Sequence, residues 1–375
     1  MPFINDMEIR IRNNAYEFNR QRYSLRIEPR GIGETKAIRQ YHHTQMAHAQ
    51  ADKERIFNRN LRYRYNLVAD LFCQQSLIKD FRELEILYED KIQVLRQMIV
   101  LPGFDITDVV KAENNLTDLK FRNMEYKQRI LRIRQEIGEL LNLSDLPVLD
   151  TAGFISVNQI SRLMTSISLE LDTNNTYLAY SRLSFSLAKS RLNLEAAEAR
   201  RFVNFFEFSY DHGNRLDELE LKNAGGIDYE LDKAYYLNVA IRLPFINTDR
   251  HTINRRKLSY FSALEDYDEQ KLILTKNLKN NVEEIRLLLD QYNFLKEESD
   301  KSIAGSSLNQ YLEMEGIDPL ILLEIKESLI KNHIHLKQIE YEIIKSYIWI
   351  LDVTGNLYNH PLLNYLSASL NVMEP

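Results

Sequence analysis

The stretch AYYLNVAIRLPFINTDRHTINRRKLSYFSALEDYDEQK, residues 234–271, changes its hydrophobic period midway. In its first part Leu237 and Val239 fall on one side and Tyr236 and Asn238 on the other, which is the two-residue period of a β-strand. The second part is rich in charge and contains no Gly or Pro, which is typical of a long helix. Only the residues PFINTD separate the two parts, so the sequence predicts a strand that leads directly into a helix.

The composition favours long elements and few turns. Among 375 residues there are only 11 Gly and 8 Pro, the residues that most often make turns. A net charge of −6 offers no basic stripe for nucleic acid, so no nucleic-acid partner is predicted. The single cysteine, Cys73, excludes an internal disulfide framework and a cysteine zinc site.

Neither a membrane helix nor a signal peptide is recognisable. There is no run of about 18 apolar residues, the length that a transmembrane helix needs. The first residues, MPFINDMEIR, lack the basic and apolar regions of a secretory signal. From this we expect either a cytosolic chain or a start at a processed or engineered position.

The chain contains two copies of one plan. The stretch LPGFDITDVVKAENNL, 101–116, resembles MEGIDPLILLEIKESL, 314–329, and such internal similarity indicates a repeated structure. Apolar residues then recur at heptad spacing, as in helices that pack along a left-handed seam. The clearest seams are Leu322, Leu329, Leu336, Ile343 and Ile350, and Leu274, Leu278, Val282, Ile285, Leu289 and Tyr292.

These patterns predict a mainly α fold with a small β part, built from coiled-coil-like helical hairpins in two structural repeats. The predicted elements of the first repeat, 1–150, are a strand hairpin (5–29), a long helix (33–99) and a second helix (104–141). Those of the second repeat, 151–358, are a helix (155–200), two strands (201–211 and 235–245) and two helices (248–303 and 318–355). A C-terminal tail, 359–375, follows.

The strands of the second repeat have the length of transmembrane strands. Each is close to the 9–11 residues that a tilted strand needs to cross a bilayer. So few strands do not form a stable isolated sheet, so we expect them to close with strands of other chains. The side chains predicted to face lipid are Phe206, Phe208, Tyr235, Leu237, Val239 and Ile241.

The strand hairpin of the first repeat is less clear. Its apolar stretches, within 5–12 and 18–29, are short, and the second carries several Arg on one face. An Arg-rich face suits a water-filled lumen and is costly toward lipid. Either these strands lie partly outside the bilayer, or the chain does not complete a contribution of four strands.

The sequence contains no catalytic motif. There is no Gly-rich phosphate loop, nucleophile elbow or HExxH metal motif. His43 and His48 are five residues apart, a poor spacing for one metal ion, and His333 and His335 lie on different faces of a helix. We therefore predict no enzymatic activity, no cofactor and no metal site.

Four segments resemble motifs of the TolC-like outer membrane efflux protein family, and they follow the family's order. They are LPGFDITDVVKAENNL (101–116), LELDTNNTYLAYSRLSFSLAKSRLNLEAAEARR (169–201), NVAIRLPF (238–245) and WILDVTGNL (349–357). The residues INTDRH, 246–251, stand where the family usually has a Gly-Gly-Arg turn. The resemblance covers most of residues 33–358.

The resemblance implies the outer-membrane exit duct of a tripartite efflux or type I secretion system. In this family, three protomers each supply four strands to a shared transmembrane β-barrel, and their helices form a hollow α-barrel in the periplasm. Substrates enter from an inner-membrane transporter through a periplasmic adaptor (membrane fusion) protein. The implied partners are thus two further copies of the chain, the adaptor, the transporter and the lipid bilayer. The implied location is the outer membrane of a Gram-negative-type cell, extending into the periplasm.

The resemblance also implies which residues meet the adaptor, although the same residue types serve as ordinary helix caps. The residues at the two hairpin tips are Leu101, Pro102, Gly103, Phe104, Asp105, Thr107, Asp108, Val109, Gly316, Ile317, Asp318, Pro319 and Leu320. The acids that would line an aperture are Asp300, Glu313, Glu315 and Asp318. A non-transporting coiled-coil envelope scaffold with the same fold is the alternative, and the sequence does not identify the cargo.

Overall fold

The computed structural model describes residues 4–13, 21–31, 33–100, 102, 104–142, 153–166, 171, 175–212, 234–241, 249–301, 318–358 and 362–370. The chain divides into two compact units. The sheet unit comprises Met1–Lys53 and Tyr177–Gln270. The helical unit comprises Glu54–Thr176 and Lys271–Pro375.

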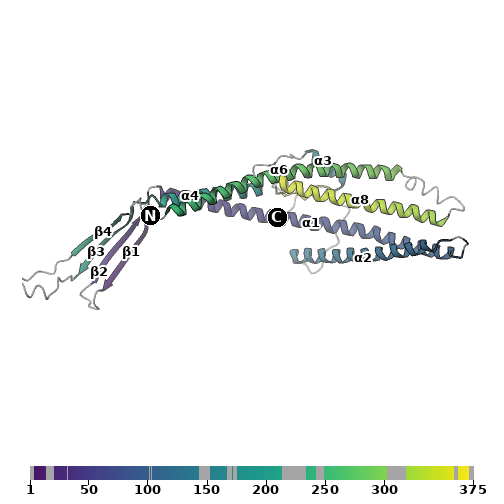
Figure 1. Cartoon of the computed structure of the whole chain (residues 1–375), viewed down its shortest axis with the longest axis horizontal. Helices are drawn as coiled ribbons and strands as arrows, with labels where there is room; N and C mark the ends of the chain where they lie inside the picture. The colour runs from purple at the N-terminus through teal and green to yellow at the C-terminus, as the bar shows by residue number, and fades with distance from the viewer. Residues whose placement is uncertain are drawn as a thin grey trace, which may run out of the picture. The chain divides into compact units, whose positions relative to one another are not determined.

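Most of the described residues are helical (Figure 1), as the predicted fold class requires. The helices are α1 (Glu34–Met98), α2 (Ile106–Leu141), α3 (Val157–Ser166), α4 (Thr176–Glu198), α6 (Asp249–Lys301), α8 (Pro319–Thr354) and the short 3-10 helix η1 (Asn356–Tyr358). Both α1 and α6 contribute residues to both units. Within the described residues, no helix combines the length and the apolar character that a membrane crossing requires.

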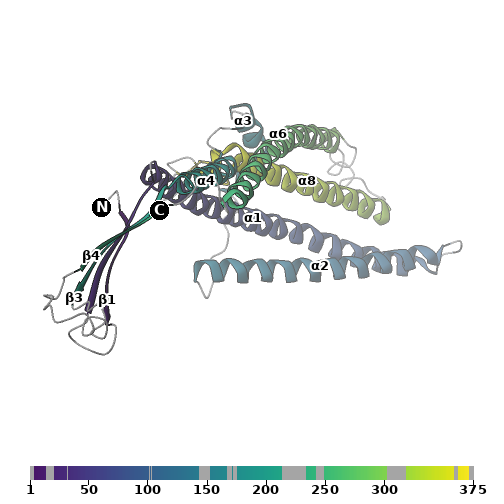
Figure 2. The ribbon, with the colours of Figure 1, turned by 60° about the vertical axis from the view of Figure 1, so that its left-hand side comes forward.

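The sheet unit holds one antiparallel sheet of four strands (Figure 2). The strands are β1 (Ile4–Asn13), β2 (Gln21–Pro29), β3 (Val203–His212) and β4 (Ala234–Ile241), in the order β1-β2-β3-β4. β1 pairs with β2 from Ile4 opposite Pro29 to Asn13 opposite Gln21. The first hairpin therefore supplies two full strands, and the chain completes a set of four.

A buried ion pair ties two strands to their helices. Glu34, which is 1% exposed at the start of α1, accepts hydrogen bonds from Gly31 N at 2.6 Å and from Arg201, two residues before β3, at 2.5 Å. A Cβ on Gly31 would lie 3.2 Å from Glu34 Oε2 and 3.3 Å from Ala197 O, so a larger residue would crowd this junction. The other junction, 242–248 between β4 and α6, lies outside the described residues.

The single helix predicted over 155–200 is wrong, because this segment forms α3 and α4. α3 ends at Ser166 and α4 begins at Thr176. Asn175, directly before α4, is buried and donates a hydrogen bond from Nδ2 to the carbonyl oxygen of Val353. Asn175 is therefore held outside α4 by a contact with the backbone of α8.

The predicted seam of α6 lies in the core of the helical unit, and so do Ile343 and Ile350 of the α8 seam, whereas Leu322, Leu329 and Leu336 are half-buried. α1 and α2 lie side by side and antiparallel, as do α6 and α8 (Figures 1 and 2). The seam prediction is confirmed most clearly by the buried residues Leu278, Val282, Ile285, Ile343 and Ile350.

Asn123 interrupts the heptad row of α2, and it is buried rather than turned outward. Its side-chain nitrogen donates to Glu85 at 2.5 Å and to the carbonyl oxygen of Phe81 at 3.5 Å. A buried Asn in a helical seam favours the one alignment in which it finds partners. Asn123 therefore helps to fix the register of α1 against α2.

The end of the chain packs against α3. The backbone N–H of Ile155 donates to Leu366 at 2.9 Å, and that of Ala368 donates to Gly153 at 2.9 Å. Leu366 is buried in the same hydrophobic cluster as the core residues of α8. Residues 362–370 therefore belong to the core of the helical unit.

Candidate functional site

One face of the sheet consists of large apolar side chains that are exposed to solvent. Each is between 41% and 72% exposed. They are Met7, Ile9, Ile11, Phe206, Phe208, Tyr235, Leu237, Val239 and Ile241. A water-soluble sheet buries such a face, so this one needs a cover that the isolated chain does not provide.

The register aligns these side chains in rows across all four strands. Ile9 lies opposite Leu25, Leu25 opposite Phe208, and Phe208 opposite Leu237. The next row toward the helices has the same apolar character, from Met7 on β1 to Val239 on β4. The six residues predicted to face lipid thus lie on a single exposed face.

An aromatic row borders the apolar face at the strand ends farthest from the helices. Tyr23, Tyr210 and Tyr235 lie opposite one another on neighbouring strands. Their ring centroids are 6.5 Å apart for Tyr23 and Tyr210 and 5.1 Å for Tyr210 and Tyr235. Tyr is enriched where a membrane protein passes from hydrocarbon to water, because the ring is apolar and the hydroxyl is polar.

The opposite face of the sheet is polar and more enclosed. Ser24, Ser209 and Asp211 are 5%, 2% and 8% exposed. Arg22 donates to the carboxylate of Asp211 through Nε at 3.0 Å and through a terminal nitrogen at 2.6 Å. The guanidinium of Arg22 also lies 5.4 Å from the ring centre of Tyr236. This face is polar, and it carries the Arg residues that made the first hairpin unclear.

The second candidate region is the pair of hairpin tips in the helical unit. Asp105 caps α2 by accepting a hydrogen bond from the backbone of Thr107 at 2.9 Å, and Asp318 caps α8 in the same way from Leu320 at 2.9 Å. Hydrogen bonds with Thr107 lower the pKa of Asp105. Pro319 occupies the first turn of α8, where its missing N–H has no cost. The repeated sequence thus gives a repeated cap.

The tip residues identified from the sequence are divided between surface and core. Pro102, Asp105, Thr107, Asp108, Asp318 and Pro319 are exposed. Val109 is buried, and Phe104 and Leu320 pack against the same cluster, so these three side chains stabilise the helices. Leu101, Gly103, Glu313, Glu315, Gly316 and Ile317 lie outside the described residues, and so does the side chain of Asp300.

Sequence reasoning missed a set of exposed apolar residues at these tips. They are Ile99, Val100, Ile106, Val110 and Ile321, between 44% and 86% exposed. Ile106, Val110 and Ile321 lie within the two similar turn segments, and Ile99 and Val100 lie just before the first. Heptad analysis selects buried positions and passes over apolar residues on the outer face.

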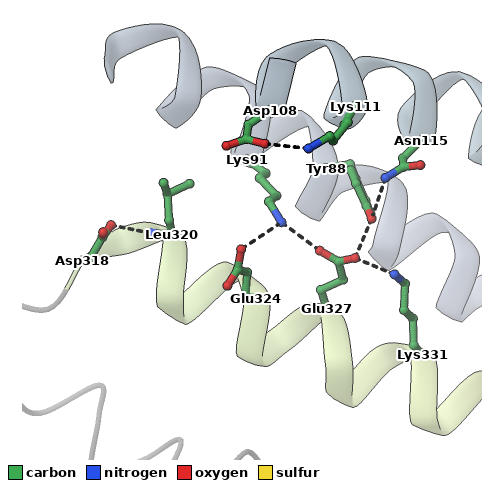
Figure 3. A network of polar contacts seen from close by, with 10 residues as sticks. All are labelled: Tyr88, Lys91, Asp108, Lys111, Asn115, Asp318, Leu320, Glu324, Glu327 and Lys331. Carbon is green, nitrogen blue, oxygen red and sulfur yellow. Dashed lines mark hydrogen bonds and ion pairs between the residues drawn. The ribbon is translucent and has the colours of Figure 1, made fainter. Parts of the chain in front are cut away.

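A polar network joins the two hairpins just behind their tips (Figure 3). Glu327 of α8 accepts hydrogen bonds from Tyr88 at 2.5 Å and Lys91 at 3.1 Å, both of α1. Asn115 of α2 donates to the Tyr88 hydroxyl at 3.3 Å, and Lys331 donates to Glu327 at 2.6 Å. The Glu327 carboxylate therefore joins α8 to α1, and Asn115 connects α2 to it through Tyr88.

The network keeps Glu327 ionised. Burial alone would raise the pKa of Glu327, but hydrogen bonds from Lys331, Tyr88 and Lys91 outweigh burial and lower it. Burial, followed by the hydrogen bond to Glu327, raises the pKa of Tyr88 to about 12, so its hydroxyl stays a donor.

Ion pairs join α1 to α8 at four levels, beginning with the pair in the network near the tips. They are Lys91–Glu327 at 3.1 Å, Lys337–Asp80 at 3.0 Å, Lys345–Asp70 at 3.5 Å and Arg62–Asp352 at 2.6 Å. Sequence reasoning did not identify these pairs, because α1 is charged along its whole length and the pairing depends on the register between helices.

Together, the two antiparallel helical hairpins and the four-stranded sheet define a TolC-like outer-membrane channel fold. No family model matches the sequence, and neither does any curated protein. The likeness is to solved structures, at identities that show the fold alone. The chain is similar to the outer membrane protein VceC of Vibrio cholerae, with 12% identity over 93% of this chain and 85% of that chain and a TM-score of 0.65.

Two further channels show the same likeness. The Campylobacter jejuni CmeC outer membrane channel is 11% identical over 98% of this chain and 78% of that chain, with a TM-score of 0.63. The outer-membrane channel OprN is 15% identical over 93% of this chain and 80% of that chain, with a TM-score of 0.61. The fold expected from the sequence motifs is therefore confirmed.

Proposed function

We propose that three copies of this chain form an outer-membrane exit duct of a tripartite efflux or type I secretion system. In this proposal the duct receives substrates from an inner-membrane transporter through a periplasmic adaptor and releases them outside the cell. The observation that carries the proposal is the distribution of side chains on the sheet: one face is apolar and exposed, and the other is polar, with Ser24, Ser209 and Asp211 buried on its central strands. The solved structures to which the chain is similar are outer-membrane channels, which supports a transport role without catalysis.

Lipid is the cover that fits the apolar face. The strands are 8 to 10 residues long, close to the 9–11 that a tilted transmembrane strand needs. The face carries no charged side chain between the Met7 row and the Tyr23 row. A charge there would cost roughly 2–4 kcal/mol at the middle of a bilayer.

The unpaired edges of this sheet support assembly with further copies of the chain. Among the described strands, β1 and β4 each pair with one neighbour only. A free edge is not tolerated in hydrocarbon, because its N–H and C=O groups find no water there. Three sheets of four strands would close into one barrel with an even number of strands, as transmembrane barrels of bacteria have.

The helical unit also presents faces that suit a second copy. Leu287 and Phe294 of α6 are seven residues apart and more than 60% exposed, and Met124 and Leu131 of α2 have the same spacing at 58% and 61%. Heptad spacing on an exposed face suits a left-handed seam with another helix. We assign these stripes to contacts between protomers of the α-barrel.

We assign the hairpin tips to the adaptor. Exposed apolar residues gather there beside the capped turns, and apolar anchors at exposed turns are typical of docking surfaces. We retain the assignment of two structural repeats, 1–150 and 151–358, so that each protomer offers two tips, and the tail 359–375 follows them. In a threefold assembly Asp300, Glu313, Glu315 and Asp318 would each recur three times, and a ring of carboxylates at an aperture favours cations.

Two measurements on the full chain test the duct. Detergent-solubilised protein from outer-membrane expression is expected to have the mass of a trimer, and it should conduct ions in planar bilayers. A water-soluble monomer without conductance would contradict the proposal and favour the scaffold alternative.

The adaptor assignment has its own test. Ile106→Asp at the tip should leave trimer mass and conductance unchanged and should reduce adaptor-dependent export. Met46→Asp, at a residue of α1 that is 75% exposed and lies in the sheet unit, is the matched control and should not affect export. Normal export by the Ile106→Asp variant would exclude this residue from the docking surface.

A further inference from the structure

The charges on the polar face of the sheet are sorted along the strands. Among the described strand residues, the charged ones at the end joined to the helices are Asp6, Glu8, Glu28, Glu207 and Arg26, four carboxylates with one guanidinium. At the far end they are Arg10, Arg12, Arg22 and Asp211, three guanidiniums with one carboxylate. The sheet is therefore acidic near the helices and basic at its far end.

The strand register brings these charges together in space. At the helix end Asp6 lies opposite Glu28, and in the next row of the polar face Arg26 lies between Glu8 and Glu207. At the far end Arg12 lies opposite Arg22, and Arg22 lies opposite Asp211. A one-residue slip would move all of these side chains to the apolar face, so the charge order depends on this register.

Internal pairing leaves part of each charge group uncompensated. Arg10 reaches Glu8 at 2.5 Å, Arg22 reaches Asp211 at 2.6 Å, and Arg26 reaches Glu28 at 3.1 Å. Across the described part of the chain, Asp6, Glu207 and Arg12 have no ion-pair partner. Two carboxylates at one end and one guanidinium at the other are thus less completely neutralised than the paired groups, and their charges act on mobile ions.

We propose that this face is an axially polarised ion path, a property that rests on the proposed duct. In a threefold barrel each of these charges would recur three times around the lumen. The acidic ring near the helices would concentrate cations, and the basic ring at the far end would concentrate anions. The path therefore selects ions by sign at each end.

The polarity predicts an asymmetric current. When the helix side is positive, cations enter through the acidic ring and anions through the basic ring, so both accumulate in the lumen and conductance is high. At the opposite voltage both kinds of ion are drawn out and conductance is low. The asymmetry should fade in 1 M salt, where charges are screened beyond about 3 Å, and be clear at 0.1 M, where screening acts beyond about 10 Å.

The test uses the full chain in planar bilayers, added from one chamber so that the helices remain on that side. In 0.1 M KCl the current with the helix side positive should exceed the current at the same voltage of opposite sign. The double variant Asp6→Lys with Arg12→Glu keeps the net charge and reverses the order of these charges, so the current ratio should fall to or below one. Arg12→Lys keeps the charge and should keep the ratio.

A second variant keeps the proposal testable if the first double variant does not assemble. Asp6→Asn with Arg12→Gln changes shape little, and it should bring the ratio closer to one. A conducting wild type with symmetric current, or variants that conduct with an unchanged ratio, would overturn the polarised path and leave the duct intact. A wild type that does not conduct would overturn the duct, and the polarised path with it.

Discussion

The sheet and the helical unit distribute apolar residues in opposite ways. In the helical unit Ile343 and Leu351 have no exposed surface. In the sheet Ile9 and Leu237 are 72% and 67% exposed, whereas Asp211 on the other face is 8% exposed. A chain surrounded by one solvent would be expected to bury its apolar residues in both regions, so the comparison supports the proposal that the exposed apolar face of the sheet meets lipid.

The arrangement of polar groups also differs between the sheet and the helical unit. In the helical unit buried polar groups occur in local pairs, such as Arg62 with Asp352, as an apolar core requires. On the sheet, charges spread over one whole face, as a surface in contact with water allows. Substitutions that reverse these rules should therefore have different costs in the two regions.

The largest effect is expected in the helical unit, at Asp352. This carboxylate is fully buried, and Arg62 Nη1 lies 2.6 Å from it. Arg62→Ala removes the ion-pair partner of this buried carboxylate, which keeps its hydrogen bond from the Tyr358 hydroxyl, and should cost about 3 kcal/mol of unfolding free energy. Urea unfolding in detergent, followed by helical circular dichroism, measures it.

The matched control is an ion pair on the surface. Lys301 and Glu297 are 3.2 Å apart, and both side chains are more than two-thirds exposed. Lys301→Ala should therefore cost about 0.5 kcal/mol or less. Similar small losses in both variants would contradict the burial of the Arg62–Asp352 pair.

The next largest effect is expected in the sheet, where substitutions on the apolar and the polar face of β4 can be compared. Val239→Arg places a charge on the apolar face and should weaken assembly by roughly 2–4 kcal/mol if the site lies near the bilayer midplane. Asn238→Arg, on the polar face one residue away, should be tolerated. The yield of heat-resistant trimer in the outer membrane measures both, and equal tolerance would remove the case for a membrane strand.

A smaller effect is expected where Glu327 joins α1 and α8. Its pKa is lowered below its ordinary value of 4.5, so the stability it supplies is present above that value and is lost as the pH falls through the lowered pKa. Glu327→Gln should cost about 1–2 kcal/mol at pH 7. In unfolding series from pH 7 to pH 3, the gap between wild type and variant should narrow below about pH 4.5. A gap independent of pH would contradict the role of the carboxylate.

The smallest effect is expected at the α8 cap. Asp318→Ala removes the acceptor for the Leu320 N–H and should cost about 1 kcal/mol. Lys326→Ala, at an exposed position of the same helix, should stay within about 0.5 kcal/mol of wild type. Thermal unfolding of the two variants compares them directly, and equal midpoints would show that the cap contributes nothing.

Hydrophobic periodicity predicted the helices and strands, but it did not predict features that depend on contacts between residues distant in sequence. The seam of α6 was predictable because Leu278, Val282 and Ile285 recur at heptad spacing and all are buried. The start of α4 at Thr176 was not, because Asn175, directly before it, is held by a hydrogen bond to the backbone of Val353, which is distant in sequence.

The same distinction between local pattern and long-range contact explains which features of the sheet and of the hairpin tips could be predicted. The Arg residues of β2 made that strand doubtful in isolation, and only its pairing with β3 shows that they share one enclosed polar face. At the tips the capping Asp105 was predictable from its position before a helix. The network around Glu327 was not, because it needs the register of α1 against α8.

The most direct test of the proposal that the apolar face of the sheet meets lipid is cysteine labelling of β4 in reconstituted liposomes, in a Cys73→Ser background. Single Cys substitutions at Leu237 and Val239 probe the apolar face, and substitutions at Tyr236 and Asn238 probe the polar face. We predict that a water-soluble maleimide labels positions 236 and 238 through the lumen, while lipid protects 237 and 239. In the isolated chain Leu237 is 67% exposed and Tyr236 only 38%, so without lipid the order should reverse. Labelling of 237 and 239 as fast as 236 and 238 in liposomes would contradict a membrane-spanning sheet.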